Sequence, residues 1–336
     1  MSFDPLAYWA IPRRVLVTGC AGFLGSSLVD TLLEQGHQVL GIDSFSDYYD
    51  PALKRENLRS ALQANNFQLM EGDLNELDLA ELVREKDVVF HLAAQAGVRA
   101  SWGSEFDLYL RANVRATQLL LEALIASMRK GGSSRRLVYS SSSSVYGNQE
   151  HYPVKENVDK HPFSPYGVTK LAAENLCELY ATNYGLPCSS LRYFTVYGPR
   201  QRPDMAFRKF LQASERGEPW VIYGDGQQSR DFTYVEDVVR ANLLAGAEER
   251  PYAAYNIGGG TRQDLLSVLE ILAEKVQEHG ISDRVKIEHA APVKGDVRHT
   301  GADGVRARDQ LKFSARIPLE EGLERMVGWY AQRVKS

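Results

Sequence analysis

Short apolar runs alternate with amphipathic stretches along the first part of the chain. Val15 to Thr18, Gln38 to Asp43 and Asp87 to Ala93 are rich in aliphatic and β-branched residues and predict buried strands. Stretches of helical period follow the strands, the first ending near Gln35 and a long one running from about Asp107 to Lys130. This alternation predicts an α/β protein with a parallel sheet and helices on both faces.

The pattern changes after the predicted strand Ser189 to Phe194. From Thr195 the chain is richer in Gly, Pro and Arg, and its elements are shorter. We expect a first domain over residues 1–190 and a smaller α/β lobe over residues 191–336, with segments near 231–258 returning to the first domain. In this second part the predicted strands are Trp220 to Tyr223 and Val285 to Glu288, and the predicted helices are near Leu265 to Gln277 and Leu319 to Ala331.

A glycine turn joins the first strand to the first helix. Its glycines are Gly19, Gly22 and Gly25, and the second strand ends at Asp43, 18 residues beyond the last of them. Glycines permit a tight turn and let backbone N–H groups approach a pyrophosphate, and an acid at this distance suits a ribose. The spacing differs from G-x-G-x-x-G, so the match depends on mechanism and context. It predicts a Rossmann-type doubly wound sheet that binds NAD, because Asp43 would repel the 2′-phosphate of NADP.

A second motif, Ser164 to Lys170, contains a candidate base. Ser164 is a good N-cap and Pro165 suits the first helical position, so Tyr166 and Lys170 should share one face of a helix. A phenol has a pKa near ~10, and we expect the ammonium to lower it. A plain surface Tyr and Lys is the alternative interpretation. Five serines, Ser140 to Ser144, follow a predicted strand and should point hydroxyls into the ligand crevice, unless they form a flexible linker.

Composition and charge bear on the partners, location and metal content of the protein. The 336 residues are 44% hydrophobic with a net charge of −4, which gives no hint of nucleic acid or an anionic membrane as partner. Apolar runs are shorter than the ~20 residues of a bilayer span, and the first residues do not resemble a signal peptide, so we expect a cytoplasmic protein. Cys20, Cys177 and Cys188 lack metal-type spacing, and we expect no metal site.

Several motifs in order resemble the extended short-chain dehydrogenase/reductases, and within them the nucleotide-sugar 4-epimerases. The motifs are Thr18-Gly19-x-x-Gly22-Phe23-x-Gly25, Gly72-Asp73-Leu74, His91-Leu92-Ala93-Ala94-Gln95, Ser141 to Gly147, Tyr166-x-x-x-Lys170, Arg230-Asp231-Phe232 and Gly295-Asp296-Val297. The resemblance implies cofactor contacts at Gly19, Gly22, Phe23, Leu24, Gly25, Asp43 (adenosine ribose), Asp73 and Leu74 (adenine), Ala93, Tyr166 and Lys170 (nicotinamide ribose).

The same resemblance implies a mechanism. Tyr166 would take the 4-hydroxyl proton, Ser142 would bridge, and NAD would accept and return the C4 hydride through a transient 4-keto sugar. The related 4,6-dehydratases have an Asp-Glu pair in the serine stretch, where this chain has only hydroxyls. That difference argues against dehydration.

The sugar is indicated by Arg192 to Pro199 and by Arg202-Pro203-Asp204-Met205-Ala206. These segments resemble UDP-glucuronate 4-epimerases, in which Thr and Arg at the places of Thr195 and Arg202 hold the C6 carboxylate. We expect Pro203 to open the next helix, so that a guanidinium and a helix N-terminus face one spot. The remaining expected substrate contacts are Arg99, Ser142, Ser143, Arg230 and Asp296, with Lys294 or Arg298 replacing an Arg that relatives often carry near Val293.

The leading interpretation is therefore NAD-dependent C4 epimerisation of a UDP-sugar, UDP-glucuronate to UDP-galacturonate. Its rivals are a 4-epimerase of neutral UDP-hexoses (UDP-glucose or UDP-N-acetylglucosamine), a UDP-glucuronate decarboxylase and a catalytically silent NAD-binding module. Family likeness also implies a homodimer that pairs the long helix and the Tyr166 helix with their copies.

Overall fold

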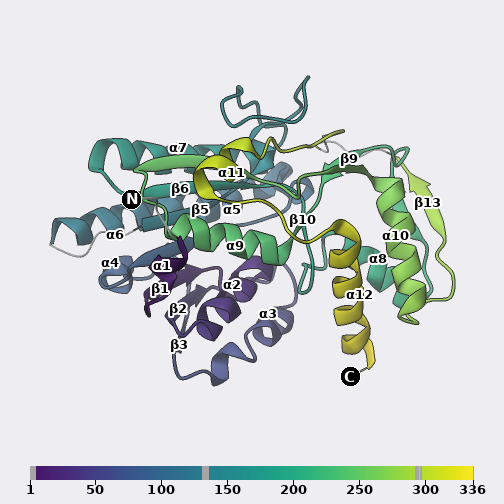
Figure 1. Cartoon of the computed structure of the whole chain (residues 1–336), viewed down its shortest axis with the longest axis horizontal. Helices are drawn as coiled ribbons and strands as arrows, with labels where there is room; N and C mark the ends of the chain where they lie inside the picture. The colour runs from purple at the N-terminus through teal and green to yellow at the C-terminus, as the bar shows by residue number, and fades with distance from the viewer. Residues whose placement is uncertain (1–4, 131–135, 292–294, 296, 336) are drawn as a thin grey trace.

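The computed structural model describes residues 5–130, 136–291, 295 and 297–335 (Figure 1). Its central feature is a parallel sheet in the order β3-β2-β1-β4-β5-β6-β11, seven strands in the described part of the chain. The strands are β1 (Arg14–Thr18), β2 (Gln38–Asp43), β3 (Phe67–Glu71), β4 (Val88–His91), β5 (Arg136–Ser142), β6 (Cys188–Tyr193) and β11 (Tyr252–Ile257). The predicted doubly wound α/β fold is confirmed.

Side chains alternate between the two faces of the sheet. Val15 and Val17 of β1 pack in one core and Leu16 packs in the other, as the two-residue period of a strand requires. Both faces are covered by helices (Figure 1). One face carries α2 (Phe23–Glu34) and α9 (Val235–Gly246), and the other carries α4 (Leu79–Val83), α6 (Ala116–Arg129) and α7 (Pro165–Tyr184).

The strand order reverses between β1 and β4, which lie side by side with Thr18 opposite His91. From this point the chain adds β2 and β3 on one side and β5, β6 and β11 on the other. In open α/β sheets the ligand crevice lies at this switch point, beyond the carboxyl ends of the strands. Gly19 and Ala93, which follow the two strands, therefore border the crevice.

The predicted long helix is interrupted. It consists of α5 (Phe106–Tyr109), a π-helical turn over Leu110–Arg115 and α6. Such turns widen the helix locally and are frequent at functional sites. Here the turn contains Asn113, whose side chain accepts a hydrogen bond from Gln95 N (2.7 Å) and donates one to Thr169 Oγ1 (2.9 Å). The turn is thus tied to the loop after β4 and to α7.

The second lobe is built on α8 (Ala206–Arg216), α10 (Leu265–Glu278) and α12 (Leu319–Lys335), beside a parallel pair of β8 (Trp220–Tyr223) and β13 (Ile287–Ala290). The chain also returns to the first lobe, where α11 (Val305–Leu311) packs on β11, the edge strand beside β6. The other short elements are α1 (Pro5–Trp9), α3 (Pro51–Asn57), β7 (Val196–Tyr197), β9 (Ser229–Asp231), β10 (Thr233–Tyr234), β12 (Arg262–Asp264) and 3₁₀ turns at Ala61–Gln63, Arg99–Ser101, Gly103–Glu105 and Ser143–Val145.

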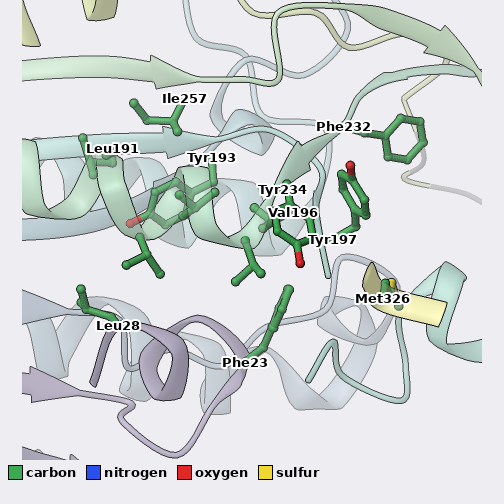
Figure 2. Close-up of a cluster of buried hydrophobic side chains, with 14 of the residues drawn as sticks. Phe23, Leu28, Leu191, Tyr193, Val196, Tyr197, Phe232, Tyr234, Ile257 and Met326 are labelled. Atoms are coloured by element: carbon green, nitrogen blue, oxygen red, sulfur yellow. The ribbon is translucent and has the colours of Figure 1, made fainter. Parts of the chain in front are cut away.

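One apolar core continues from the sheet into the second lobe. Figure 2 shows Leu28 and Leu191 at the sheet, then Tyr197 and Tyr234, and finally Met326 of α12. These side chains are buried, so the two lobes are joined by hydrophobic packing and not by a linker alone. Among the helices in the described part of the chain, none offers the apolar length that a bilayer span requires.

Candidate active site

Helix α7 carries the candidate base, and its start is built as predicted. Ser164 Oγ accepts a hydrogen bond from Gly167 N (3.1 Å), Pro165 is the first helical residue, and Gly185 ends the helix with φ +69°. Tyr166, Lys170 and Glu174 are spaced by four and lie on one face. Tyr166 is therefore placed in the first turn of a well-capped helix.

Tyr166 faces groups from three other segments. Its hydroxyl is hydrogen-bonded to Ser142 at the end of β5, and its ring lies edge-on to Tyr109, with centroids 6.4 Å apart. Burial raises the pKa of Tyr166, and this rise is opposed by the Arg202 guanidinium and the Ser142 hydroxyl. Arg202 is thus the cation that most favours the phenolate in this structure.

The expectation that Lys170 lowers the Tyr166 pKa below its ordinary value is wrong here. The Lys170 ammonium donates a hydrogen bond to Ser140 O (2.8 Å) and lies over the Tyr139 ring, 5.1 Å from its centroid. Burial lowers the pKa of Lys170 to about 8. The spacing of four residues placed both side chains on one face, but desolvation acts on both groups and determines the direction of each shift.

The glycine turn is shaped by close backbone approaches. A Cβ on Gly25 would lie 2.0 Å from Gly19 O, and a Cβ on Gly19, at φ +71°, would lie 2.7 Å from Ala93 N. Gly22 is the N-cap of α2 and brings no capping side chain, so first-turn N–H groups can approach an anion. Gly19, Gly22, Phe23, Leu24 and Gly25 therefore fit the pyrophosphate of a dinucleotide.

Asp43 and Asp73 mark the adenosine end of this crevice. Asp43 is buried and accepts hydrogen bonds from Ala21 N (3.0 Å) and Phe45 N (2.9 Å), which fixes the acid beside the glycine turn. Asp73 accepts from Asn75 N (2.8 Å) and forms an ion pair with Arg111 (3.1 Å), next to buried Leu74. The backbone N–H groups of the glycine turn are suited to the pyrophosphate of NAD, and the Asp43 carboxylate is suited to a ribose diol.

Arg202 belongs to a polar cluster that sequence reasoning did not find. Its Nε and Nη2 donate to the two carboxylate oxygens of Asp204, each at 2.9 Å, and Asp204 also accepts from Tyr48 OH (3.2 Å). The prediction that Pro203 opens the next helix is wrong, because α8 begins at Ala206, with Met205 as N-cap. The intervening residues form a turn closed by Met205 N and Arg202 O (3.1 Å). This turn lets Asp204 fold back on Arg202.

The remaining predicted substrate residues are more dispersed. Thr195 lies just before β7, Ser143 begins the 3₁₀ turn after β5, and the Arg99 guanidinium covers the Tyr223 ring of β8 at 4.4 Å. Arg230 donates to Ser229 O and Arg298 O (2.9 and 3.0 Å), and Arg298 itself pairs with Asp225 (2.8 Å) near the surface. Asp296 and Lys294 lie outside the described residues.

A buried ion pair behind Ser142 is a second feature that was not predicted. Arg192 of β6 pairs with Glu174 of α7 (2.6 Å), both at least 97% buried, and Ser141 Oγ donates to Glu174 (2.6 Å). Arg192 also donates to Tyr146 OH (2.6 Å). The pair ties α7 to the end of β5, where Ser142 lies. Its one sequence signal was that Glu174 follows Lys170 by four residues.

An apolar cavity of about 790 Å³ opens beside the start of α7. Its walls include Trp102, Phe106, Phe163, Pro165 and Val168. It therefore lies at the N-terminal end of α7, but neither Tyr166 nor Lys170 is among its lining residues. No group of three or more potential metal ligands occurs among the described residues.

Comparison with known proteins identifies the family. The model of the NAD dependent epimerase/dehydratase family matches residues 15–258, from β1 through β11. The chain belongs to this family. Like other members, this epimerase/dehydratase-family enzyme uses NAD, and the glycine turn and Asp43 fit that cofactor.

Three similar proteins extend the comparison. The chain is 40% identical to the Bacillus subtilis protein named uncharacterized UDP-glucose epimerase YtcB, over 94% of this chain and 97% of that one. The UDP-glucuronic acid 4-epimerase of Bacillus cereus, solved with UDP-glucuronic acid and NAD, superposes with a TM-score of 0.87 at 37% identity, covering 95% and 99% of the two chains. MoeE5, solved with NAD and either UDP-glucuronic acid or UDP-glucose, superposes with a TM-score of 0.82 at 41% identity, covering 96% of this chain and 100% of that one.

Proposed function

We propose that this enzyme interconverts UDP-glucuronate and UDP-galacturonate by epimerisation at C4. The observation that carries the proposal is the position of Arg202, whose guanidinium is close enough to Tyr166 to oppose the rise in its pKa. A cation beside the base is suited to a substrate with a carboxylate next to the reacting carbon. The B. cereus epimerase supports this substrate by likeness over nearly the whole chain.

The Arg202–Asp204 pair leaves a second face of the guanidinium for the substrate. Arginine has five N–H donors, and Asp204 uses one on Nε and one on Nη2. Both N–H groups of Nη1 and one of Nη2 point away from Asp204, in the fork that binds a carboxylate end-on. Asp204 would therefore orient Arg202, while Thr195 would assist Arg202 in binding the substrate carboxylate.

The proposed chemistry uses groups already in contact. Tyr166 in its phenolate form, which Arg202 and Ser142 favour, takes the proton of the 4-hydroxyl and returns it to the C4 oxygen when the 4-keto sugar is reduced. NAD, held by the glycine turn and Asp43, would supply the acceptor for the C4 hydride and the source of the hydride that re-forms the C4–H bond. Lys170, held by Ser140 O, lies on the same helical face as Tyr166 and would hold the nicotinamide ribose. There is no net redox change.

The 4-keto sugar formed from a glucuronate is a β-keto acid, which loses CO₂ when its carboxylate bond aligns with the carbonyl π system. Charge-assisted hydrogen bonds from a fixed guanidinium can hold the carboxylate out of that alignment while the ring turns. Arg202 is fixed by Asp204, and Asp204 by Tyr48. This arrangement favours epimerisation over decarboxylation.

Product analysis by NMR tests the proposal. The enzyme is incubated with UDP-glucuronate and, separately, with UDP-glucose. UDP-galacturonate should form, with kcat/KM for the acid at least about a hundredfold higher, because only a carboxylate can accept charge-assisted hydrogen bonds from the Arg202 N–H groups that Asp204 does not use. UDP-pentose as the main product would indicate a decarboxylase instead, and equal rates for both substrates would remove the carboxylate role of Arg202.

Epimerisation of neutral UDP-hexoses is the second candidate function. Asp204 already compensates the charge of Arg202, so a sugar without a carboxylate would not leave that guanidinium unpaired. The likeness to MoeE5 and to the B. subtilis protein is compatible with this candidate. The same two-substrate experiment distinguishes it from the first.

A homodimer is also proposed, with α7 and the helical segment before α6 at the interface. Large apolar side chains are exposed along this side, where Leu108, Leu110, Val168 and Leu179 are 39–53% exposed. Helix pairs that bury such side chains are a common basis for twofold dimers. Sedimentation at micromolar concentration should give twice the chain mass, and a monomer would overturn this proposal. A cytoplasmic location stays a prediction.

A further inference from the structure

A small cavity lies between the two lobes, on a side that the glycine turn, Ser142, Tyr166 and Lys170 do not line. Its walls come from α3 of the first lobe, from the turn before α8, and from α8 and α12 of the second lobe. Arginine is the commonest residue in these walls, and none of the lining residues is acidic. The lining residues are Tyr49, Leu53, Asn57, Arg200, Gln201, Arg202, Pro203, Arg208, Trp329 and Arg333.

Three of these arginines have a carboxylate partner outside the cavity. Arg200 pairs with Asp30 (2.7 Å), Arg202 with Asp204, and Arg333 with Glu56. Their charges are compensated on the far side of each side chain. The wall that they form is still positive, because none of the residues that line the cavity is acidic.

Arg208 differs from the other three arginines. It is 6% exposed, and its Nε and Nη1 have no hydrogen-bond partner among the described residues. The guanidinium lies over the rings of Trp329 and Tyr330, 5.2 and 4.4 Å from their centroids. Stacking on aromatic faces offsets part of the lost hydration, but it supplies no negative charge. Burial, together with the charge of Arg333, lowers the pKa of Arg208.

The acidic side chains that act on Arg208 are engaged elsewhere. Glu56 binds Arg333, and Glu215 accepts a hydrogen bond from Tyr330 OH. A buried cation without a partner is costly, and buried charges in proteins are normally paired. The missing partner of Arg208 would have to enter through the cavity, because Arg208 is one of its walls.

We propose that this cavity, which shares Arg202 with the proposed substrate site, is a second anion site that takes one small tetrahedral oxyanion of the phosphate class. The cavity volume is about 20 Å³, and one water needs roughly 10–15 Å³. The site therefore suits a compact ion and excludes a nucleotide. The guanidinium of Arg208, together with those of Arg200 and Arg333 in the same walls, matches the several oxygen acceptors of such an ion.

The position of the site gives the anion a structural role. It touches α3 of the first lobe and α8 and α12 of the second, so it bridges the lobes. Gln201 accepts a hydrogen bond from Arg208 N (3.0 Å) and, with Arg202 and Pro203, forms the wall on the active-site side. An anion bound here stabilises the same turn that positions Arg202 and Asp204.

The melting temperature of the holoenzyme tests the site. Enzyme saturated with NAD and UDP is compared in about 10 mM sodium phosphate and in sodium chloride of equal ionic strength and pH. Phosphate should raise the melting temperature by about 2 °C or more, because an ion that binds only the folded state stabilises it. Titration calorimetry with inorganic phosphate should give one site per chain.

Variants assign the effect to the cavity. Arg208→Met should lose the phosphate shift, Arg208→Lys should keep part of it, and Arg216→Met, an exposed position on the same helix, should keep all of it. If Arg208→Met is insoluble, Arg333→Met replaces it and should reduce the shift. The proposal is overturned if phosphate does not shift the melting temperature of the wild type, or if it shifts that of Arg208→Met equally. It is also overturned if the shift occurs only in enzyme free of NAD and UDP, since the ion would then occupy a diphosphate position of the crevice.

Discussion

Tyr166 combines deep burial with a hydrogen bond to Ser142 and the nearby charge of Arg202. Replacing it with Phe removes only the hydroxyl, so turnover should fall by about 10²-fold or more while nucleotide-sugar affinity stays nearly unchanged. Steady-state kinetics and a binding titration with UDP measure the two effects separately. Activity within about threefold of wild type would place the base elsewhere.

In the proposed mechanism, Arg202 acts on Tyr166 as well as on the substrate. Because its guanidinium favours the phenolate, Arg202→Met should raise the Tyr166 pKa further and move the rise of kcat with pH to higher pH. UDP-glucose is the substrate for this measurement. It has no carboxylate that binds Arg202, so the variant changes the base without also removing a contact to the substrate. With UDP-glucuronate, the same variant should increase the share of UDP-pentose among the products. An unchanged pH profile would mean that Arg202 does not influence the base.

Asp204 provides a separate test of the orientation of Arg202. Asp204→Asn replaces one acceptor oxygen by an N–H group that faces Nη2 of Arg202, so the guanidinium should rotate. We expect the preference for UDP-glucuronate over UDP-glucose to fall by about tenfold, with more UDP-pentose. Tyr48→Phe, which removes one hydrogen bond to Asp204, should give a smaller change in the same direction. A higher affinity for the acid in Asp204→Asn would instead make Asp204 a competitor of the substrate.

At the scale of elements, the N-terminus of α7 couples stability to catalysis. Ser164 caps this helix and Asp264 caps α10 in the same way, through a side-chain oxygen that accepts a backbone N–H. Either change to Ala should cost about 1 kcal/mol of stability, measured by denaturant unfolding. Only Ser164→Ala should also lower kcat, because α7 carries Tyr166 and Lys170. Equal kinetic effects of the two variants would argue against this coupling.

Elements also show where local sequence signals suffice. The capped start of α7 and the glycine turn before α2 were predicted because each depends on residues within a few positions of one another. The start of α8 was mispredicted because Pro203 is as suitable for a turn as for a first helical position. The fold of that turn depends on Arg202 and Asp204 meeting Tyr48, which is 156 residues away from Asp204.

At the scale of the whole molecule, retention of NAD depends on the fit between the glycine turn and the loop after β4. A reaction that restores its own oxidant allows the cofactor to stay bound, so NAD should co-purify and NADH should not accumulate during turnover. Gly25→Ala should abolish this retention, because its Cβ would lie 2.0 Å from Gly19 O. Gly304→Ala, where an added Cβ meets nothing within 4 Å, is the matched control. Cofactor content after denaturation, read by absorbance, decides the outcome.

The sequence by itself determined the features whose causes are local: the alternation of strands and helices, the glycine turn with Asp43, and the helical face shared by Tyr166 and Lys170. Tertiary structure decided the approach of Arg202 to Tyr166, the burial that raises the pKa of Tyr166, the Arg192–Glu174 pair behind Ser142 and the arginine-lined cavity around Arg208. Each of these joins segments that are far apart in the chain. Spacing along the sequence reports which side chains share one element, whereas the charge and solvent around a group depend on every element packed against it.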